Sequence, residues 1–338
     1  MTCRDVRPSD DLMTAQFTRR TCIAALGAAI TSRHASAQQA PEPVIGLLDS
    51  SAATALKFSA FYEALKVEGF SRNQNLTVEY HSAEGDYARL PKLAADLVNR
   101  RVNLITALGS PAALAAKAAT ASIPIVFAVD ANPIEIGLIA NLSHSGANIC
   151  GVAAIGVARE QKRLELLRAA VPAASLFGVL VNPQNSNQDA QIKDAVASAQ
   201  KIGVQIKLVR ASTGAEFGNI FVELAQSQAA GLVIADDEFF LGAGVQLGSL
   251  AARHSMPAVF HGAAFATAGG LLSYGSRLPE LYHQAGAYSG LVLAGASPAE
   301  LPIFQSTGTE TIVNLRSAKS FGIVLPQAMI DQANSVIR

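Results

Sequence analysis

Residues 102–130 read VNLITALGSPAALAAKAATASIPIVFAVD. The stretch begins with an aliphatic run at 102–107, continues with an alanine-rich segment from Pro111, and ends in a β-branched run at 123–129. Short apolar strands separated by one helix are typical of a βαβ unit, and such units build parallel sheets. These residues therefore predict an α/β fold.

The same alternation extends from this unit toward both ends of the chain. Before it, strands are expected at 44–48 and 76–80, with helices ending near Gly69 and running over 87–100. After a glycine-rich passage at 146–156 the cycle restarts. The later predicted elements are helices over 158–171, 187–202, 215–228, 279–294 and from Pro326, and strands at 176–181, 205–209, 231–235, 257–261, 271–274 and 311–315.

Two sets of βαβ cycles predict two Rossmann-like lobes with parallel sheets. We expect residues 43–156 plus about 278–300 to form the N-terminal lobe. Residues 157–277 plus about 301–338 are expected to form the C-terminal lobe. Because ligands bind beyond the carboxyl ends of open parallel sheets, a ligand cleft is expected between the lobes.

Charge and motifs exclude several function classes. The 338 residues include 26 basic and 26 acidic residues. This balance, without a block of about five like charges, argues against a nucleic acid, an anionic membrane or a polyanionic ligand. Dinucleotide-binding, Walker, G-x-S-x-G and H-E-x-x-H motifs are absent, and the histidines lack metal-ligand spacing. We expect a binding protein without catalysis, cofactor or metal.

Residues 1–37 are typical of a cleavable signal peptide. Arg19 and Arg20 precede an apolar run at 21–30, and Ala-Ser-Ala at 35–37 offers a small-residue cleavage site. The arginine pair approximates a twin-arginine signal, and Sec export stays open. An amphipathic first helix is the alternative, but the segment lacks helical polar periodicity. The sequence therefore predicts a mature protein in the periplasm.

Met13 is the expected translation start, because residues 1–12 are unusual ahead of such a signal.

Removal of the signal peptide would leave one thiol. Cys3 and Cys22 precede the cleavage site, so Cys150 is the only cysteine expected in the mature chain. Its strand-like surroundings favour a buried residue over a catalytic nucleophile, and no disulfide can form within one chain.

Small polar residues follow the predicted strands. Gly109 and Ser110 open a helix whose free N–H groups suit a carboxylate, although capping alone also explains them. The Asp236 carboxylate could bind a ligand's ammonium group or sugar hydroxyls. Alternatively, Asp236 and Asp237 together could bind a divalent cation or act as an acid–base pair. Tyr274 is either an aromatic wall or a core residue. The candidate ligand-binding residues are Ser50, Ser51, Gly109, Ser110, Asp130, Asn132, Asn182, Asn185, Asp236 and Tyr274.

Several segments together resemble one family. They are AEGDYARLP at 83–91, GSPAALAAKAA at 109–119, IPIVF at 123–127, KRLELL at 162–167 and GGLLSYG at 269–275. From about Pro43 to Arg338 the chain resembles the ABC-transporter substrate-binding family that includes tryptophan- and tyrosine-uptake receptors.

The resemblance implies a type I periplasmic-binding fold whose lobes close on a ligand, with an ABC permease and ATPase as partners. It also implies that the serine-side loops at Ser50, Ser51, Gly109 and Ser110 hold a carboxylate and that Asp236 holds an ammonium. We therefore expect a monomeric importer component that captures an amino acid or a related small carboxylate. A sensory receptor for a membrane kinase or chemoreceptor is the alternative, and a secreted enzyme a remote one. The chain has no Trp, so the ligand's identity stays open.

Overall fold

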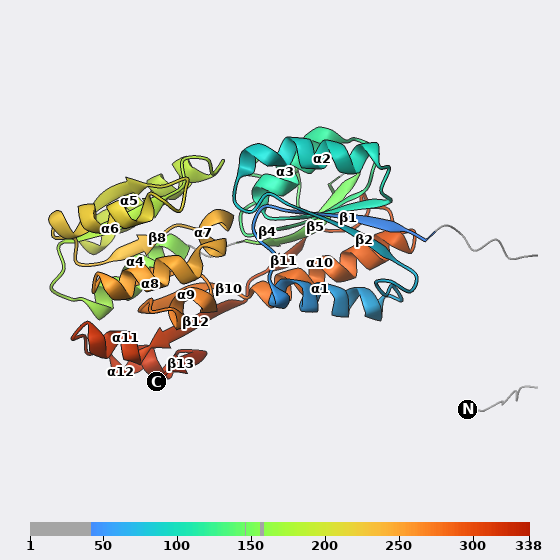
Figure 1. The fold of residues 1–338 in the computed structure, drawn as a ribbon. Coiled ribbons are helices and arrows are strands. Elements are labelled where there is room, and N and C mark those ends of the chain that lie inside the picture. Colours follow the sequence, from blue (N-terminus) through green and yellow to red (C-terminus); the bar gives the residue numbers. More distant parts are fainter. Residues whose placement is uncertain (1–41, 146, 156–158) are drawn as a thin grey trace, which may run out of the picture. The chain divides into compact units, whose positions relative to one another are not determined.

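A parallel sheet forms the first part of the described chain (Figure 1). The computed structural model describes residues 42–145, 147–155 and 159–338, so the predicted signal peptide lies outside the described residues. Among the described residues, six strands pair in the order β11-β5-β4-β3-β1-β2, all in parallel. They are β1 (Val44–Asp49), β2 (Thr77–Ser82), β3 (Leu104–Leu108), β4 (Ile125–Val129), β5 (Ile149–Ala154) and β11 (Phe304–Ser306).

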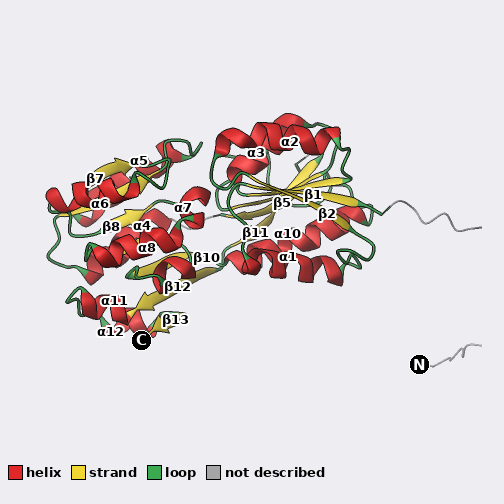
Figure 2. Ribbon diagram, in the orientation of Figure 1, coloured by secondary structure: helices red, strands yellow, loops and turns green. Residues whose placement is uncertain are grey.

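Helices cover both faces of this sheet (Figure 2). Leu97 packs with Phe127 on one face, and Phe61 packs with the adjacent Val126 on the other. Since successive strand residues point to opposite faces, burial of both faces explains the continuously apolar strands. The helical elements are α1 (Ala55–Val67), the short 3₁₀ helix η1 (Tyr87–Arg89), α2 (Leu90–Asn99), α3 (Ser110–Ala119) and α10 (Leu278–Leu293).

The second sheet is mainly parallel. In the part of the chain with described placement, its order is β13-β12-β10-β9-β8-β6-β7, and only the β10–β12 pairing is antiparallel. The strands are β6 (Leu176–Val181), β7 (Gln205–Arg210), β8 (Leu232–Ile234), β9 (Ala258–Phe260), β10 (Leu272–Ser276), β12 (Thr309–Asn314) and β13 (Ser335–Ile337).

This sheet also has a core on each face. Leu164 packs with Val233 on one face, and Phe221 packs with Ile234 on the other. The helices are α4 (Arg159–Ala170), α5 (Gln188–Ile202), α6 (Phe217–Gln226), α7 (Glu238–Gly242), α8 (Gly244–Arg253), α9 (Ala263–Thr267), α11 (Leu315–Ser320) and α12 (Gln327–Asp331). The prediction of two α/β lobes with parallel sheets is confirmed.

The chain passes between the sheets after β5, after β10 and after β11. Phe304 of β11 pairs with Val152 of β5, so the chain stays with the first sheet until Ser306. The expected return to the second lobe near residue 301 stays a prediction. The described residues from Glu42 to Arg338 belong to one compact unit. None of the helices in the described ranges is long and apolar enough to span a bilayer.

Candidate functional site

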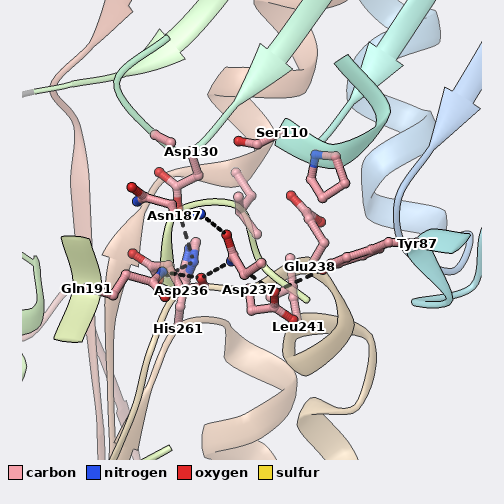
Figure 3. Close-up of a pocket in the computed structure, with 14 residues that line it drawn as sticks. Tyr87, Ser110, Asp130, Asn187, Gln191, Asp236, Asp237, Glu238, Leu241 and His261 are labelled. Carbon is pink, nitrogen blue, oxygen red and sulfur yellow. Dashed lines mark hydrogen bonds and ion pairs between the residues drawn. The ribbon is translucent and has the colours of Figure 1, made fainter. Parts of the chain in front are cut away.

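Residues beyond the carboxyl ends of strands from both sheets line one small pocket (Figure 3). Its free space is about 40 Å³, and it shares Asp130, Ala131, Asn187, Gln191 and Asp236 with a neighbouring cavity of about 280 Å³. The pocket is lined by Tyr87, Ser110, Pro111, Asp130, Ala131, Asn185, Asn187, Gln191, Asp236, Asp237, Glu238, Leu241, His261 and Leu278. The cleft edge predicted from the strand ends is thus where the pocket lies.

Gly109 links β3 to α3 and brings the start of that helix to the pocket. Its φ is 91°, and a Cβ there would lie 2.7 Å from Ser50 Oγ and 2.8 Å from Glu238 Cγ, so glycine is required. The Ala112 N–H donates to Ser50 Oγ at 2.9 Å, which caps α3. The Ser110 hydroxyl lines the pocket and has no hydrogen-bond partner among the described residues. The pocket therefore meets a free hydroxyl at the positive end of a helix.

A buried ion pair supports the loop after β1. Lys57 Nζ lies 2.9 Å from both carboxylate oxygens of Asp49 and donates to Ser51 Oγ at 2.8 Å. Burial raises the pKa of Asp49, although Lys57 opposes this shift. Ser51 in turn donates to Glu238 Oε2 at 3.3 Å. Ser51 therefore does not line the pocket itself but supports Glu238, which does.

Two arginines hold Asp236, the acid that the resemblance assigns to a ligand ammonium. Arg159 Nε donates to its Oδ2 at 2.8 Å, and Arg163 Nη2 donates to its Oδ1 at 2.5 Å. Burial alone would favour the neutral carboxyl, but Arg163 and Arg159 hold the pKa of Asp236 well below its usual range. The charge of Asp236 is thus compensated within the protein, without a ligand.

Asp237 accepts hydrogen bonds from neutral donors instead. Asn182 donates to Oδ1 at 3.1 Å, and Asn185 and Tyr87 donate to Oδ2 at 2.9 and 3.0 Å. The backbone N–H of Phe239 donates to Oδ1 at 3.0 Å, so Asp237 also caps α7. Burial raises the pKa of Asp237 in spite of these bonds. Asp237 is therefore hydrogen-bonded, but no positively charged side chain among the described residues contacts it.

Glu238, the third consecutive acid, faces the pocket beside the start of α3 (Figure 3). Burial raises the pKa of Glu238 to about 7, with Asp49, Asp130 and Asp237 adding to the shift and Lys57 opposing it. Within the described ranges, no basic side chain forms an ion pair with it. The pocket therefore contains two neighbouring acids that form no ion pair within the described part of the chain.

Asp130, Asp236 and His261 could be mistaken for a cation site, since one ligand atom of each lies within 4.8 Å of the others. Arg159, however, pairs with Asp130 at 3.2 Å as well as with Asp236. The Ser276 hydroxyl donates to Asp130 Oδ1 at 2.6 Å. Because guanidinium groups already neutralise both carboxylates, the cluster is an ion-pair network that joins β4, β8 and α4.

The structure divides the predicted site residues into groups. Ser110, Asp130, Asn185 and Asp236 line the pocket. Asn132 lines the neighbouring cavity, where its Nδ2 donates to Glu135 at 2.8 Å. Ser50, Ser51, Gly109 and Asn182 support lining residues from behind. Tyr274 does not line the pocket; its carbonyl accepts a hydrogen bond of 2.8 Å from Arg163.

The predicted ligand contacts did not include six polar lining residues: Tyr87, Asn187, Gln191, Asp237, Glu238 and His261. Glu238 and His261 follow β8 and β9, so the same strand-end argument that found Asp236 could have found them. Gln191 lies in the first turn of α5, and Tyr87 lies in the short η1 helix. No local pattern distinguishes these two from ordinary helix residues, because only the tertiary fold brings them to the pocket.

The sequence matches a known family over nearly all of its described length. The family described as ABC transporter substrate binding protein matches residues 44–337. This chain belongs to that family. The family prediction made from the sequence is confirmed, and the family is one of substrate-binding proteins, not of enzymes.

Proteins similar to this substrate-binding protein include one named for tyrosine binding and one whose structure contains L-Trp. A tyrosine-binding protein of Clostridioides difficile (strain R20291) is 25% identical over 260 residues, covering 77% of this chain and 74% of the relative. An ABC domain in complex with L-Trp from Streptococcus pneumonia has a TM-score of 0.79 at 23% identity, covering 88% of this chain and 100% of that one. A conserved domain protein of Vibrio cholerae has a TM-score of 0.80 at 23% identity, covering 87% and 99%. These structures share the two-lobed fold.

Proposed function

We propose that this substrate-binding protein captures an amino acid for an ABC importer. The observation that carries the proposal is that Asp237 and Glu238 form no ion pair with a described basic residue, in a pocket whose other acids are paired with arginines. A ligand ammonium would supply the missing positive charge through charge-assisted hydrogen bonds. A simple carboxylate without an amino group would instead meet unfavourable negative charge, so the site favours an amino acid.

The start of α3 supports a place for the ligand carboxylate. The Ser110 hydroxyl is free to donate, and the helix dipole favours a negative group there. Pro111, Leu241 and Leu278 supply apolar lining for the rest of the ligand. The relatives named for tyrosine and crystallised with L-Trp support an amino-acid ligand.

Capture by closure of the two lobes is part of this proposal. Ser110 and Asp130 come from the first sheet, and Asp237 and Glu238 come from the second. A ligand that contacts both sets stabilises the arrangement in which they face each other. The proposal therefore includes entry of the amino acid while the two sets are apart. Export to the periplasm and delivery by a monomer to a permease and ATPase complete the proposal.

Calorimetry with the common L-amino acids tests the proposed ligand class. We expect at least one amino acid to bind, and its analogue with hydrogen in place of the amino group to lose about 1.5–3 kcal/mol of binding free energy. This loss reflects the missing charge-assisted bonds to Asp237 and Glu238. An analogue that binds as tightly as the amino acid would remove the ammonium from the proposal.

The variant Glu238→Gln should reproduce most of that loss, because it keeps the size of the side chain and removes its charge. Glu63→Gln is the matched control, since Glu63 is an exposed acid on α1, away from the pocket lining. Equal affinities of wild type and Glu238→Gln would exclude Glu238 as the partner of the ammonium.

A further inference from the structure

Gln191 carries a buried acceptor that receives no hydrogen bond from the described residues. Its side chain is 5% exposed, and its Nε2 donates to the backbone carbonyl of Asp236 at 2.6 Å. Its Oε1 is buried and has no hydrogen-bond partner among the described residues. Buried polar atoms of native proteins nearly always have a partner, so an unpaired acceptor in a ligand pocket indicates what the ligand supplies.

The orientation of this amide is determined by its surroundings. The Asp236 carbonyl accepts hydrogen bonds from both Gln191 Nε2 and Asn185 Nδ2. Exchanging the amide O and N of Gln191 would place its oxygen against that carbonyl oxygen, and two acceptors repel each other. Oε1 is therefore the atom left without a partner.

Gln191 lines the pocket at a distance from the proposed ammonium site. In Figure 3, Gln191 and Glu238 lie on opposite sides of the pocket, with Asp237 between them. Gln191 also lines the neighbouring cavity of about 280 Å³, which offers room for a side chain. Gln191 therefore faces the part of the pocket away from Glu238.

We infer that Gln191 determines ligand specificity: its Oε1 accepts a hydrogen bond from an N–H or O–H group on the side chain of the bound amino acid. This inference rests on the proposed function and narrows it to amino acids with a donor in the side chain. A ligand without that donor leaves Oε1 buried and unpaired, and such mismatches discriminate strongly between otherwise similar ligands.

Calorimetry with matched pairs of amino acids tests the inference. The pairs are L-tyrosine and L-phenylalanine, L-serine and L-alanine, and L-glutamine and L-methionine, in which only the first member has a side-chain donor. We expect wild type to bind one donor-bearing member at least about tenfold more tightly than its pair. Gln191→Met keeps the length of the side chain and should reduce that preference to near unity. Gln200→Met, an exposed glutamine on the same helix, is the matched control.

Each result bears on the inference in a distinct way. Equal affinities of wild type for the two members of every pair that it binds overturn the inference while leaving the proposed function intact, and this comparison does not depend on whether a variant folds. A preference that persists in Gln191→Met also overturns it, because another group or a water then satisfies the donor. If no amino acid binds, the proposed function fails and the inference fails with it.

Discussion

Three consecutive acids after β8 show how their partners set the chemistry of identical functional groups. Asp236 is paired with two arginines and its pKa is lowered, whereas burial raises the pKa of Asp237 and of Glu238. The family resemblance implied Asp236 as the ammonium partner. Its arginine partners are 73 and 77 residues away in the chain, so no local pattern could reveal them.

The raised pKa of Glu238 predicts that ligand affinity increases with pH. Between about pH 5 and pH 7 the free protein holds a proton on Glu238 that a bound ammonium would displace. Affinity should therefore rise by up to about tenfold per pH unit through this window and level off above pH 7. Calorimetry in two buffers of different ionisation enthalpy should detect the released proton. A flat profile in wild type would contradict this assignment, and Glu238→Gln should show a much weaker dependence.

At the scale of elements, the close packing of α10 against α1 depends on a glycine that sequence periodicity did not single out. The sequence predicted a helix at 279–294, and α10 spans Leu278–Leu293. Its packing against α1 depends on Gly286, where a Cβ would lie 2.3 Å from the carbonyl oxygen of Phe61. An apolar pattern marks the buried face of a helix, but it does not show how closely the neighbouring backbone approaches.

Two glycine-to-alanine variants should change stability in opposite directions. Gly286→Ala should lower the free energy of unfolding by about 1–3 kcal/mol, because the added methyl group meets backbone that cannot move easily. Gly218→Ala in α6 meets nothing within 4 Å and should be neutral or stabilising by up to about 1 kcal/mol. Urea denaturation measures both. A stable Gly286→Ala would show that α1 and α10 can separate at little cost.

For the molecule as a whole, Arg159 is a main connection between the two sheets. Its helix α4 packs with the second sheet, and its guanidinium binds Asp236 there. The same guanidinium donates to the backbone carbonyls of Asp130 at 2.8 Å and Ala154 at 3.4 Å, beyond β4 and at the end of β5. A single buried side chain thus joins both sheets next to the pocket.

The variant Arg159→Met should destabilise the protein by about 3–5 kcal/mol, since it leaves buried carboxylates with less compensation. Arg253→Met is the control, because Arg253 is exposed at the end of α8. Chemical denaturation followed by circular dichroism measures the difference. Similar unfolding midpoints for the two variants would show that Asp130 and Asp236 do not need this guanidinium.

The amino-acid sequence by itself determined the α/β class, the two lobes, the family and the strand ends around which the pocket forms. These properties depend on apolar periodicity, turn residues and short motifs, all of which are local in the chain. Only the tertiary structure decided which acids lack a counter-charge and that Gln191 is left with an unpaired acceptor. Charge compensation and hydrogen bonding are properties of spatial neighbours, and the neighbours of Asp236, Glu238 and Gln191 come from distant parts of the sequence.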